Sequence, residues 1–105
     1  MDIKNCPVCG AVLVKTSYSV TEYSYACHTK PNNSKLWHYA ISFRNEQYIE
    51  YINFGKYSAE YFSRNNSTRI FHLEKKYESP IALFSNKIEF SDKWDEMIDN
   101  LLLLI

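Results

Sequence analysis

Three cysteines and a histidine in the first 38 positions have the types and spacing of a metal site: Cys6, Cys9, Cys27 and His38. Cys6 and Cys9 stand two residues apart in the segment CPVCG, and Gly10 allows the backbone to turn with a positive φ after the second thiol. Seventeen residues lie between Cys9 and Cys27, enough for a hairpin that brings the second half of a site beside the first. Three thiolates and one imidazole are a typical ligand set for tetrahedral zinc.

The fourth ligand is a choice between two histidines. His28 directly follows Cys27, and neighbouring side chains of an extended chain point in opposite directions, so these two residues would have difficulty sharing one ion. His38 opens the next strand-like segment, after a loop that can fold it back. We therefore favour His38 over His28, and we expect His72 to have a structural role inside a strand.

Zinc is favoured over two other interpretations of the cysteines. A CxxC pair can be a redox dithiol, but that motif stands between a strand and a helix, whereas the residues after Cys9 are strand-like. Buried free thiols would account for the cysteines singly, but not for CPxCG together with a third cysteine and a histidine at ribbon-like spacing. Three cysteines are also an odd number, which suits a disulfide framework poorly.

The expected zinc is structural, and the protein is not expected to be an enzyme. A catalytic zinc keeps an open position and has a general base nearby, such as the glutamate of a deaminase His-x-Glu motif. The two candidate histidines stand in HTK and HYA, without such a glutamate. A cluster of acids near the C-terminus is explained by the solvent-facing side of a helix; it comprises Asp92, Asp95, Glu96 and Asp99.

Strand-like segments fill the part of the chain that must position these ligands. Alternating or β-branched residues separated by polar turn residues predict antiparallel strands. We expect strands at residues 11–18, 23–27, 37–43, 47–54, 57–62 and 68–77, with short segments at 81–84 and 87–90.

The final residues change to a helical period. Apolar side chains recur at steps of three and four, which predicts a helix over residues 91–105 with Ser91 or Asp92 as its N-cap. The apolar stripe consists of Trp94, Met97, Ile98, Leu101, Leu102 and Ile105.

These segments predict one α+β domain spanning residues 1–105. We expect an N-terminal zinc-ribbon subregion (1–40), an antiparallel β-sheet meander (41–90) and one C-terminal helix (91–105) packed on the sheet. A chain of 105 residues buries a modest core, so a bound metal would add useful stability.

Composition narrows the class of partner and the compartment. The formal net charge is zero, which argues against tight non-specific nucleic-acid binding. The N-terminus MDIKN has no apolar run typical of a signal peptide, and the C-terminal LLLLI is far shorter than the roughly 20 residues that span a membrane. We expect a protein of a reducing cytoplasm, with no membrane partner.

The order of these features resembles that of small, mostly uncharacterised zinc-ribbon proteins encoded by bacteriophages. The resemblance rests on CPVCG, on YAC after a hairpin, on HYAISF opening an aromatic strand, and on the tyrosine-rich strands before a short closing helix. It implies a zinc-ribbon fold with one structural Zn²⁺. It also implies an accessory role in the host bacterial cytoplasm, such as that of an anti-CRISPR-like or other counter-defence inhibitor.

Two hypotheses for function follow. The first is a protein-binding module that blocks a host protein or defence complex, since nine tyrosines and two tryptophans supply the residue types that anchor interfaces. Its candidate anchors are Tyr51, Tyr57 and Tyr61, expected on the sheet face opposite the helix. The alternative is a single-stranded nucleic-acid or transcription-related zinc-ribbon protein, with bases stacked on sheet aromatics. Its candidate phosphate contacts are Arg64, Arg69, Lys75 and Lys76.

Overall fold

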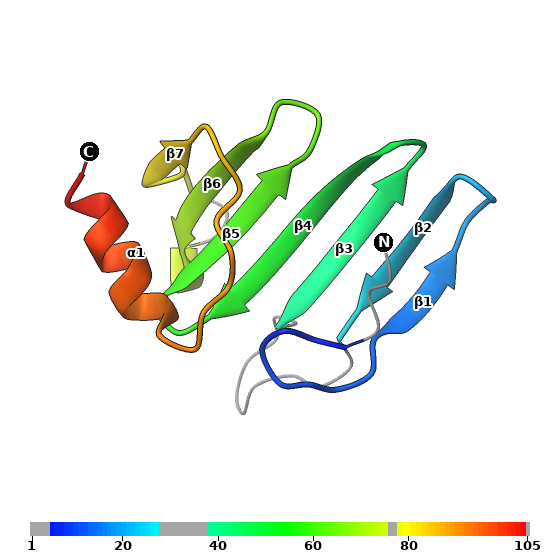
Figure 1. Ribbon diagram of the computed structural model, residues 1–105, viewed down its shortest axis with the longest axis horizontal. Coiled ribbons are helices and arrows are strands. Elements are labelled where there is room, and N and C mark those ends of the chain that lie inside the picture. The colour runs from blue at the N-terminus through cyan, green and yellow to red at the C-terminus, as the bar shows by residue number, and fades with distance from the viewer. Residues whose placement is uncertain (1–4, 28–37, 76–77, 105) are drawn as a thin grey trace.

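The computed structural model describes residues 5–27, 38–75 and 78–104 of the chain. Within these residues, seven strands form one antiparallel sheet in sequence order and a C-terminal helix follows (Figure 1). The elements are β1 (Val14–Ser17), β2 (Glu22–Ala26), β3 (Tyr39–Arg44), β4 (Gln47–Phe54), β5 (Tyr57–Phe62), β6 (Ser67–His72), the short 3-10 helix η1 (Leu73–Lys75), β7 (Ala82–Phe84) and α1 (Trp94–Leu102). The expected antiparallel meander with one C-terminal helix is confirmed.

The two N-terminal strands belong to the same sheet as the other five. Tyr25 of β2 pairs with Ile41 of β3, and Lys15 of β1 pairs with Tyr25. The division that we expected at residue 40 therefore falls inside β3, and no boundary separates a ribbon from the meander within the described strands. The segment that stands apart from the sheet is residues 5–13 (Figure 1).

Tight turns between successive strands hold their register. Asn45, Gly55 and Asn66 have φ angles of 58°, 61° and 50°, and they lie in the β3–β4, β4–β5 and β5–β6 turns. Asparagine and glycine adopt this left-handed conformation at the lowest cost, and it suits the twist of a tight hairpin. Register matters because a shift of one residue would move every side chain of a strand to the other face.

β1 and β6 are the two strands that fall well short of the expected lengths. β1 begins at Val14 rather than at residue 11, because the carbonyl of Ala11 accepts a hydrogen bond of 2.8 Å from the backbone N–H of Cys6 and so belongs to the preceding turn. β6 ends at His72, and η1 takes the chain onward from Leu73.

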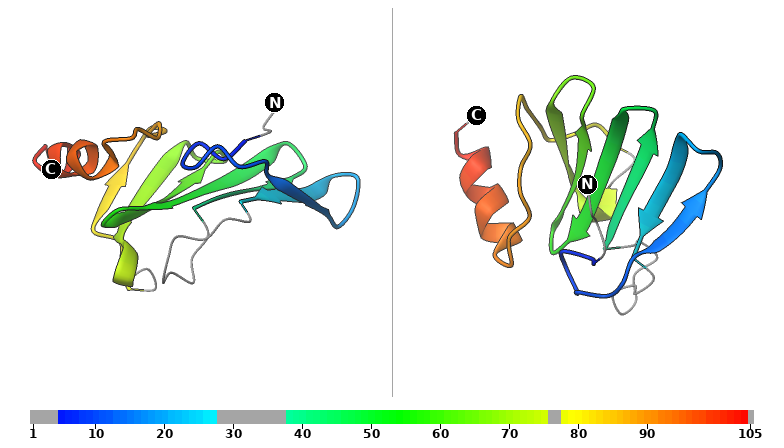
Figure 2. Two further views of the ribbon diagram at one scale, coloured as in Figure 1. Left: turned by 90° about the horizontal axis from the view of Figure 1, so that it is seen from below. Right: turned by 45° about the vertical axis from the view of Figure 1, so that its right-hand side comes forward.

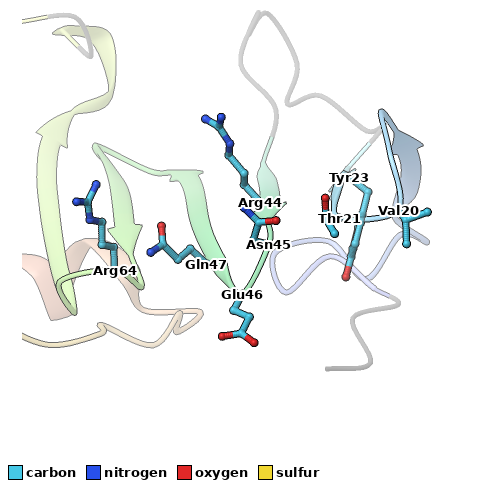
Figure 3. Close-up of a pocket in the computed structure, with 8 residues that line it drawn as sticks. All are labelled: Val20, Thr21, Tyr23, Arg44, Asn45, Glu46, Gln47 and Arg64. Carbon is cyan, nitrogen blue, oxygen red and sulfur yellow. The ribbon is translucent and has the colours of Figure 1, made fainter.

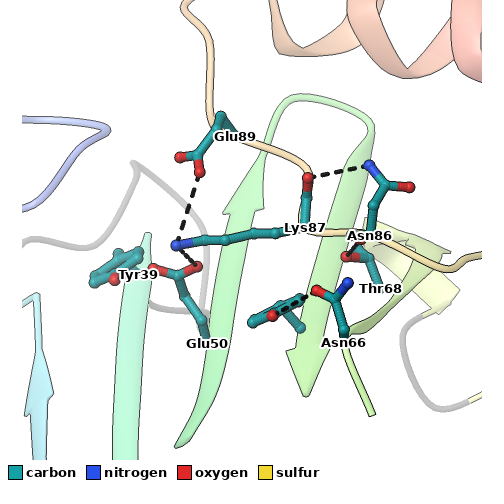
Figure 4. Close-up of polar contacts among 8 residues, drawn as sticks. Tyr39, Glu50, Asn66, Thr68, Asn86, Lys87 and Glu89 are labelled. Carbon is teal, nitrogen blue, oxygen red and sulfur yellow. Dashed lines mark hydrogen bonds and ion pairs between the residues drawn. The ribbon is translucent and has the colours of Figure 1, made fainter. Parts of the chain in front are cut away.

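The strand expected at residues 87–90 is not formed. This segment instead crosses one face of the sheet on its way to α1 (Figures 1 and 4). Ile88 and Phe90 pack against the core, and Lys87 Nζ lies 3.5 Å from Glu50 Oε1 on β4. Its apolar side chains therefore serve as a cover for the sheet rather than as an eighth strand.

The two faces of the sheet have different surroundings. The segment 5–13, the segment that leads from β7 to α1, and α1 itself all lie on one side, which we call the covered face (Figure 2). One row of paired residues on this face runs from β3 to β7 and is buried throughout; it consists of Tyr39, Ile52, Ala59, Ile70 and Ala82. The alternate residues of each strand form the outer face.

α1 is shorter than the segment over which a helix was expected, and its N-cap differs. The helix begins after Lys93, which has no side-chain capping bond, so the expectation of Ser91 or Asp92 as N-cap is wrong. The reason is local, because Ser91 Oγ accepts a hydrogen bond of 3.1 Å from the N–H of Lys93 and so lies outside the helix.

The helix docks through its apolar stripe. Trp94 and Ile98 are fully buried, and the indole N–H of Trp94 donates a hydrogen bond of 3.1 Å to the carbonyl oxygen of Tyr57. Burying two such side chains stabilises the contact by roughly 3–6 kcal/mol relative to exposure. No helix in the described part of the chain is long and apolar enough to cross a membrane.

We had expected the acids of the helix to face solvent only. Two of them instead contribute to this docking. Asp95 Oδ1 accepts a hydrogen bond of 2.8 Å from the backbone N–H of Lys56 in the β4–β5 turn. Asp99 accepts a hydrogen bond from the hydroxyl of Tyr57 and pairs with the ammonium of Lys56 at 3.0 Å. The acids therefore attach the helix to one end of β5.

Candidate metal centre

The first half of the site is a backbone turn that presents Cys6 and Cys9. The N–H of Cys6 donates to the carbonyl of Ala11 and the N–H of Gly10 donates to the carbonyl of Cys6, both at 2.8 Å. Gly10 has a φ of 75°, a conformation that favours glycine. The N–H of Val8 points at Cys6 Sγ at 3.4 Å, a contact that favours a negatively charged sulfur.

The second half of the site comes from the ends of two paired strands. Cys27 follows β2, and its N–H donates to the carbonyl of Tyr39 at 2.9 Å, so the β2–β3 ladder continues past Ala26. His38 directly precedes β3, and its carbonyl accepts a hydrogen bond of 2.9 Å from the N–H of Asn53 on β4. Three adjacent strands thus hold Cys27 and His38 in place.

The structure brings the two halves together. One ligand atom from each of Cys6, Cys9, Cys27 and His38 can be chosen so that all four lie within 4.8 Å of one another. The sulfurs of Cys9 and Cys27 are 3.4 Å apart, while two thiolates on one tetrahedral zinc are about 3.8 Å apart when each Zn–S bond is about 2.3 Å. The arrangement is compatible with a metal site.

Burial and polarity also suit a bound cation. Cys6 and Cys27 are 2% and 0% exposed, and Cys9 stands at the surface. His38 Nδ1 is buried without a hydrogen-bond partner among the described residues, a cost that a bond to a metal would offset. Such buried polar atoms are rare unless something binds them.

The electrostatics favour a thiolate at Cys9. Burial opposes the charged form, but hydrogen bonds with the backbone of Ala11 and with the side chains of His38, Cys27 and Cys6 outweigh it. Together they lower the pKa of the Cys9 thiol from 9.0 to about 6. Since the thiolate is the species that binds metals, the group is prepared for coordination near neutral pH.

The other two histidines of the chain are His28 and His72. His28, the alternative fourth ligand, lies outside the described residues. His72 does not belong to the four-residue cluster; it is the exposed last residue of β6, and its ring stacks on that of Tyr57 with centroids 5.8 Å apart. That contact agrees with the structural role expected for it.

The three candidate anchor tyrosines do not share one face. Tyr57 and Tyr61 lie on the covered face, whereas the half-buried Tyr51 lies on the outer face, as the register of β4 and β5 shows. Tyr57 is 5% exposed, and its hydroxyl bonds to Asp99 of α1. The expectation of Tyr57 as an exposed anchor opposite the helix is therefore wrong, because the helix docks on it. Tyr61 also lies on the helix side of the sheet, so the expected face is wrong for Tyr61 as well.

A row of aromatic rings crosses four strands on the covered face, and sequence reasoning did not find it as a unit. The rings of Tyr23, Phe43, Tyr48 and Tyr61 follow one another from β2 to β5, with centroids 5.0, 5.7 and 5.8 Å apart in turn. We call these four residues the aromatic row. Alternation within each strand was visible in the sequence, but the pairing between strands that aligns the rings was not.

The basic residues proposed for phosphate binding are scattered. Arg69 points to the outer face over the ring of Phe62, Arg64 lies in the β5–β6 turn, and Lys75 lies in η1, beyond the other end of β6. Lys76 lies outside the described residues. A six-residue strand is about 20 Å long, so Arg64 and Lys75 are far apart.

Arg64 does have a second arginine near it. It lines a hollow at the turn end of the sheet with Arg44, and both guanidinium groups extend to the same side (Figure 3). Acids balance this charge, because Glu46 lines the same hollow and Glu22 pairs with Arg44 at 3.6 Å. The hollow therefore lacks the excess positive charge that phosphate binding needs.

Comparisons of the chain with protein-family models, with curated proteins and with solved structures each found no match. Function is therefore inferred from the geometry of the site.

Proposed function

We propose that this is a non-enzymatic zinc protein in which one Zn²⁺, held by Cys6, Cys9, Cys27 and His38, fastens the segment 5–13 to the ends of β2 and β3. The observation that supports it is the convergence of three thiols and one imidazole from separate parts of the chain. Soft thiolates with imidazole favour zinc over hard cations such as Mg²⁺ or Ca²⁺.

The zinc is structural in this proposal. Four protein ligands complete a tetrahedron and leave no position for a substrate or a reactive water. Structural zinc sites contribute on the order of 10–16 kcal/mol of apparent binding energy at neutral pH, which is large compared with the stability of a small domain.

Metal analysis of the purified full chain tests the metal and its ligands. We expect about one equivalent of zinc, which Cys27→Ser and His38→Ala should abolish because each removes one corner of the tetrahedron. His72→Ala is the matched control and should retain the metal, since His72 lies outside the cluster. A folded wild-type protein without zinc, or a His38→Ala protein that keeps a full equivalent, would contradict the proposal.

The role of the assembled protein, in the same proposal, is to bind a partner protein. Tyrosine hydroxyls at the rim of packed rings are typical interface anchors, and the aromatic row lies on the covered face, the side that also carries the segment 5–13 and α1. Lys15 adds a cation 4.7 Å from the ring centroid of Tyr23. That the partner is a host protein blocked by a phage accessory protein follows from the resemblance alone.

Nucleic-acid binding is the second candidate and has weaker support. Stacking of bases needs free ring faces, but Tyr23 and Phe43 are inclined by 26° with centroids 5.0 Å apart, so each covers a face of the other. The zero net charge and the scattered arginines and lysines also argue against nucleic-acid binding.

Capture from a bacterial lysate by the immobilised protein, with two matched tyrosine variants, tests the partner surface. Tyr61→Ala should weaken capture by tenfold or more, because interface tyrosines contribute about 2 kcal/mol, whereas Tyr51→Ala on the outer face should not. If Tyr51→Ala weakened capture and Tyr61→Ala did not, the interface would lie on the outer face. Binding that depends on Arg64 and Arg69 and falls steeply from 50 to 300 mM salt would instead support nucleic acid as the ligand.

A further inference from the structure

β1 forms one edge of the sheet, and its exposure is unusual. All four of its residues are exposed; Val14 at its start is 41% exposed, and Tyr18 directly after its end is 75% exposed. Edge strands present unpaired backbone groups that can template another strand, so proteins usually protect them. The other edge, β7, has three residues and follows Pro80 closely.

The direction in which the backbone N–H and C=O groups of β1 point follows from the hydrogen-bond pattern between β2 and β3. The bond from Cys27 N–H to the Tyr39 carbonyl shows that alternate residues of β2, namely Ala26 and Ser24, direct their groups towards β1. Their register partners, Val14 and Thr16, therefore bond to β2, and the N–H of Tyr18 continues this pattern with a 2.8 Å bond to the carbonyl of Glu22.

Lys15 and Ser17 consequently direct their N–H and C=O groups away from the sheet. No strand of the described chain lies beyond β1 to receive them. The edge thus offers four backbone groups at the spacing of an antiparallel ladder.

We propose that this edge pairs with the same edge of a second copy of the chain, antiparallel, about a two-fold axis at Thr16. In this register Lys15 lies opposite Ser17 of the second copy in a hydrogen-bonded pair, and both sets of outward groups are satisfied. On the outer face, Val14 lies opposite Tyr18 of the second copy, so the two exposed apolar side chains cover one another.

The neighbouring symmetric registers are less favourable. An axis at Lys15 sets two ammonium groups directly opposite, which is destabilising. An axis at Ser17 requires the N–H of Ser19, which already donates to the carbonyl of Glu22 at 3.0 Å. The Thr16 axis avoids both conflicts and places two threonines in a pair that favours strands.

Cross-linking tests the register on the full chain. At the two-fold axis, Thr16 lies opposite Thr16 of the second copy in a non-hydrogen-bonded pair. The two Cα atoms of such a pair are about 4.5 Å apart, which a disulfide can span. Thr16→Cys should form covalent dimers under mild oxidation at least tenfold faster than Lys15→Cys, with the wild type as the blank for the native cysteines. Equal rates for the two variants would overturn the register.

Sedimentation over a range of protein concentrations tests the interface itself. We expect reversible dimers of the wild type, lost in Ser17→Pro, because proline removes an outward N–H without touching the bonds to β2. Ser17→Thr keeps that N–H and should still dimerise, and an unchanged circular dichroism spectrum shows that both variants fold. A wild type that stays monomeric at all concentrations, or a Ser17→Pro protein that dimerises like Ser17→Thr, would overturn the proposal. Neither result bears on the zinc site.

Discussion

Gly55 lies in a turn where even one added carbon atom would clash with a neighbouring side chain. It turns the chain between β4 and β5 with a φ of 61°, and a Cβ built there would lie 2.1 Å from Asp95 Oδ1. The same carboxylate accepts the N–H of Lys56. The glycine therefore permits both the turn and the close approach of α1.

We expect Gly55→Ala to lower the free energy of unfolding by about 2–4 kcal/mol. About 1–2 kcal/mol comes from the left-handed backbone and the remainder from displacing the Asp95 carboxylate. In the Asp95→Ala background the same change should cost only the backbone share. Urea denaturation of the four proteins of this cycle measures the difference, and equal costs in both backgrounds would show that the contact with Asp95 is unimportant.

At the scale of elements, the contact between α1 and β5 depends on two titratable groups. Hydrogen bonds from Tyr57 and Lys56 lower the pKa of Asp99 below its usual 3.8. The hydrogen bond to Asp99, together with burial, raises the pKa of the Tyr57 hydroxyl above its usual 10.0. Ionised Asp99 and neutral Tyr57 are thus the forms that the docked helix favours.

Docking of α1 should weaken at both extremes of pH. The Asp99 contribution is complete above pH 3.8 and is lost as the pH falls below it, and the Tyr57 contribution is complete below pH 10.0 and is lost as the pH rises above it. The NMR signal of the Trp94 indole N–H, which bonds to the Tyr57 carbonyl, reports the contact. Asp99→Asn should remove most of the acid-side change, and an identical acid titration in that variant would refute the assignment.

At the scale of the whole molecule, the sheet and the segment 5–13 differ in how much their stability would depend on the proposed zinc. The row from Tyr39 to Ala82 and the buried side chains of α1 form most of the core cluster, which residues 5–13 extend at one end. That segment adds Cys6 and Leu13 to the buried set and packs Val8 and Ala11 against it, and the metal in the proposed site would attach it further.

Removal of zinc by a chelator should therefore release the segment and leave the sheet folded. We expect hydrogen exchange at the amides of Cys6 and Gly10 to accelerate at least a hundredfold, while those of β4 to β6 stay protected. Added zinc should restore the protection. Loss of protection across the whole sheet would mean that the metal is needed for the core itself.

Local patterns in the sequence were sufficient for the order of elements and for the four residues that the structure brings together as a candidate metal site. Alternation, turn residues and a change of period predict a meander closed by a helix because each depends on near neighbours. Spacing favoured the three cysteines, since a hairpin can return the chain to its start, and the opposite directions of neighbouring side chains favoured His38 over His28. Helix and strand ends were less predictable, because hydrogen bonds such as that between Ser91 and Lys93 determine them.

Only the tertiary structure decided which side chains of different strands lie on the same face of the sheet. Tyr57 and Tyr51 were equivalent candidates in the sequence, yet the register between β4 and β5 places them on opposite faces, and α1 then buries Tyr57. A one-residue change in pairing would reverse that result, and pairing depends on contacts between distant parts of the chain. The aromatic row and the outward-facing groups of β1 have the same origin, because each is a property of aligned strands and not of any one strand.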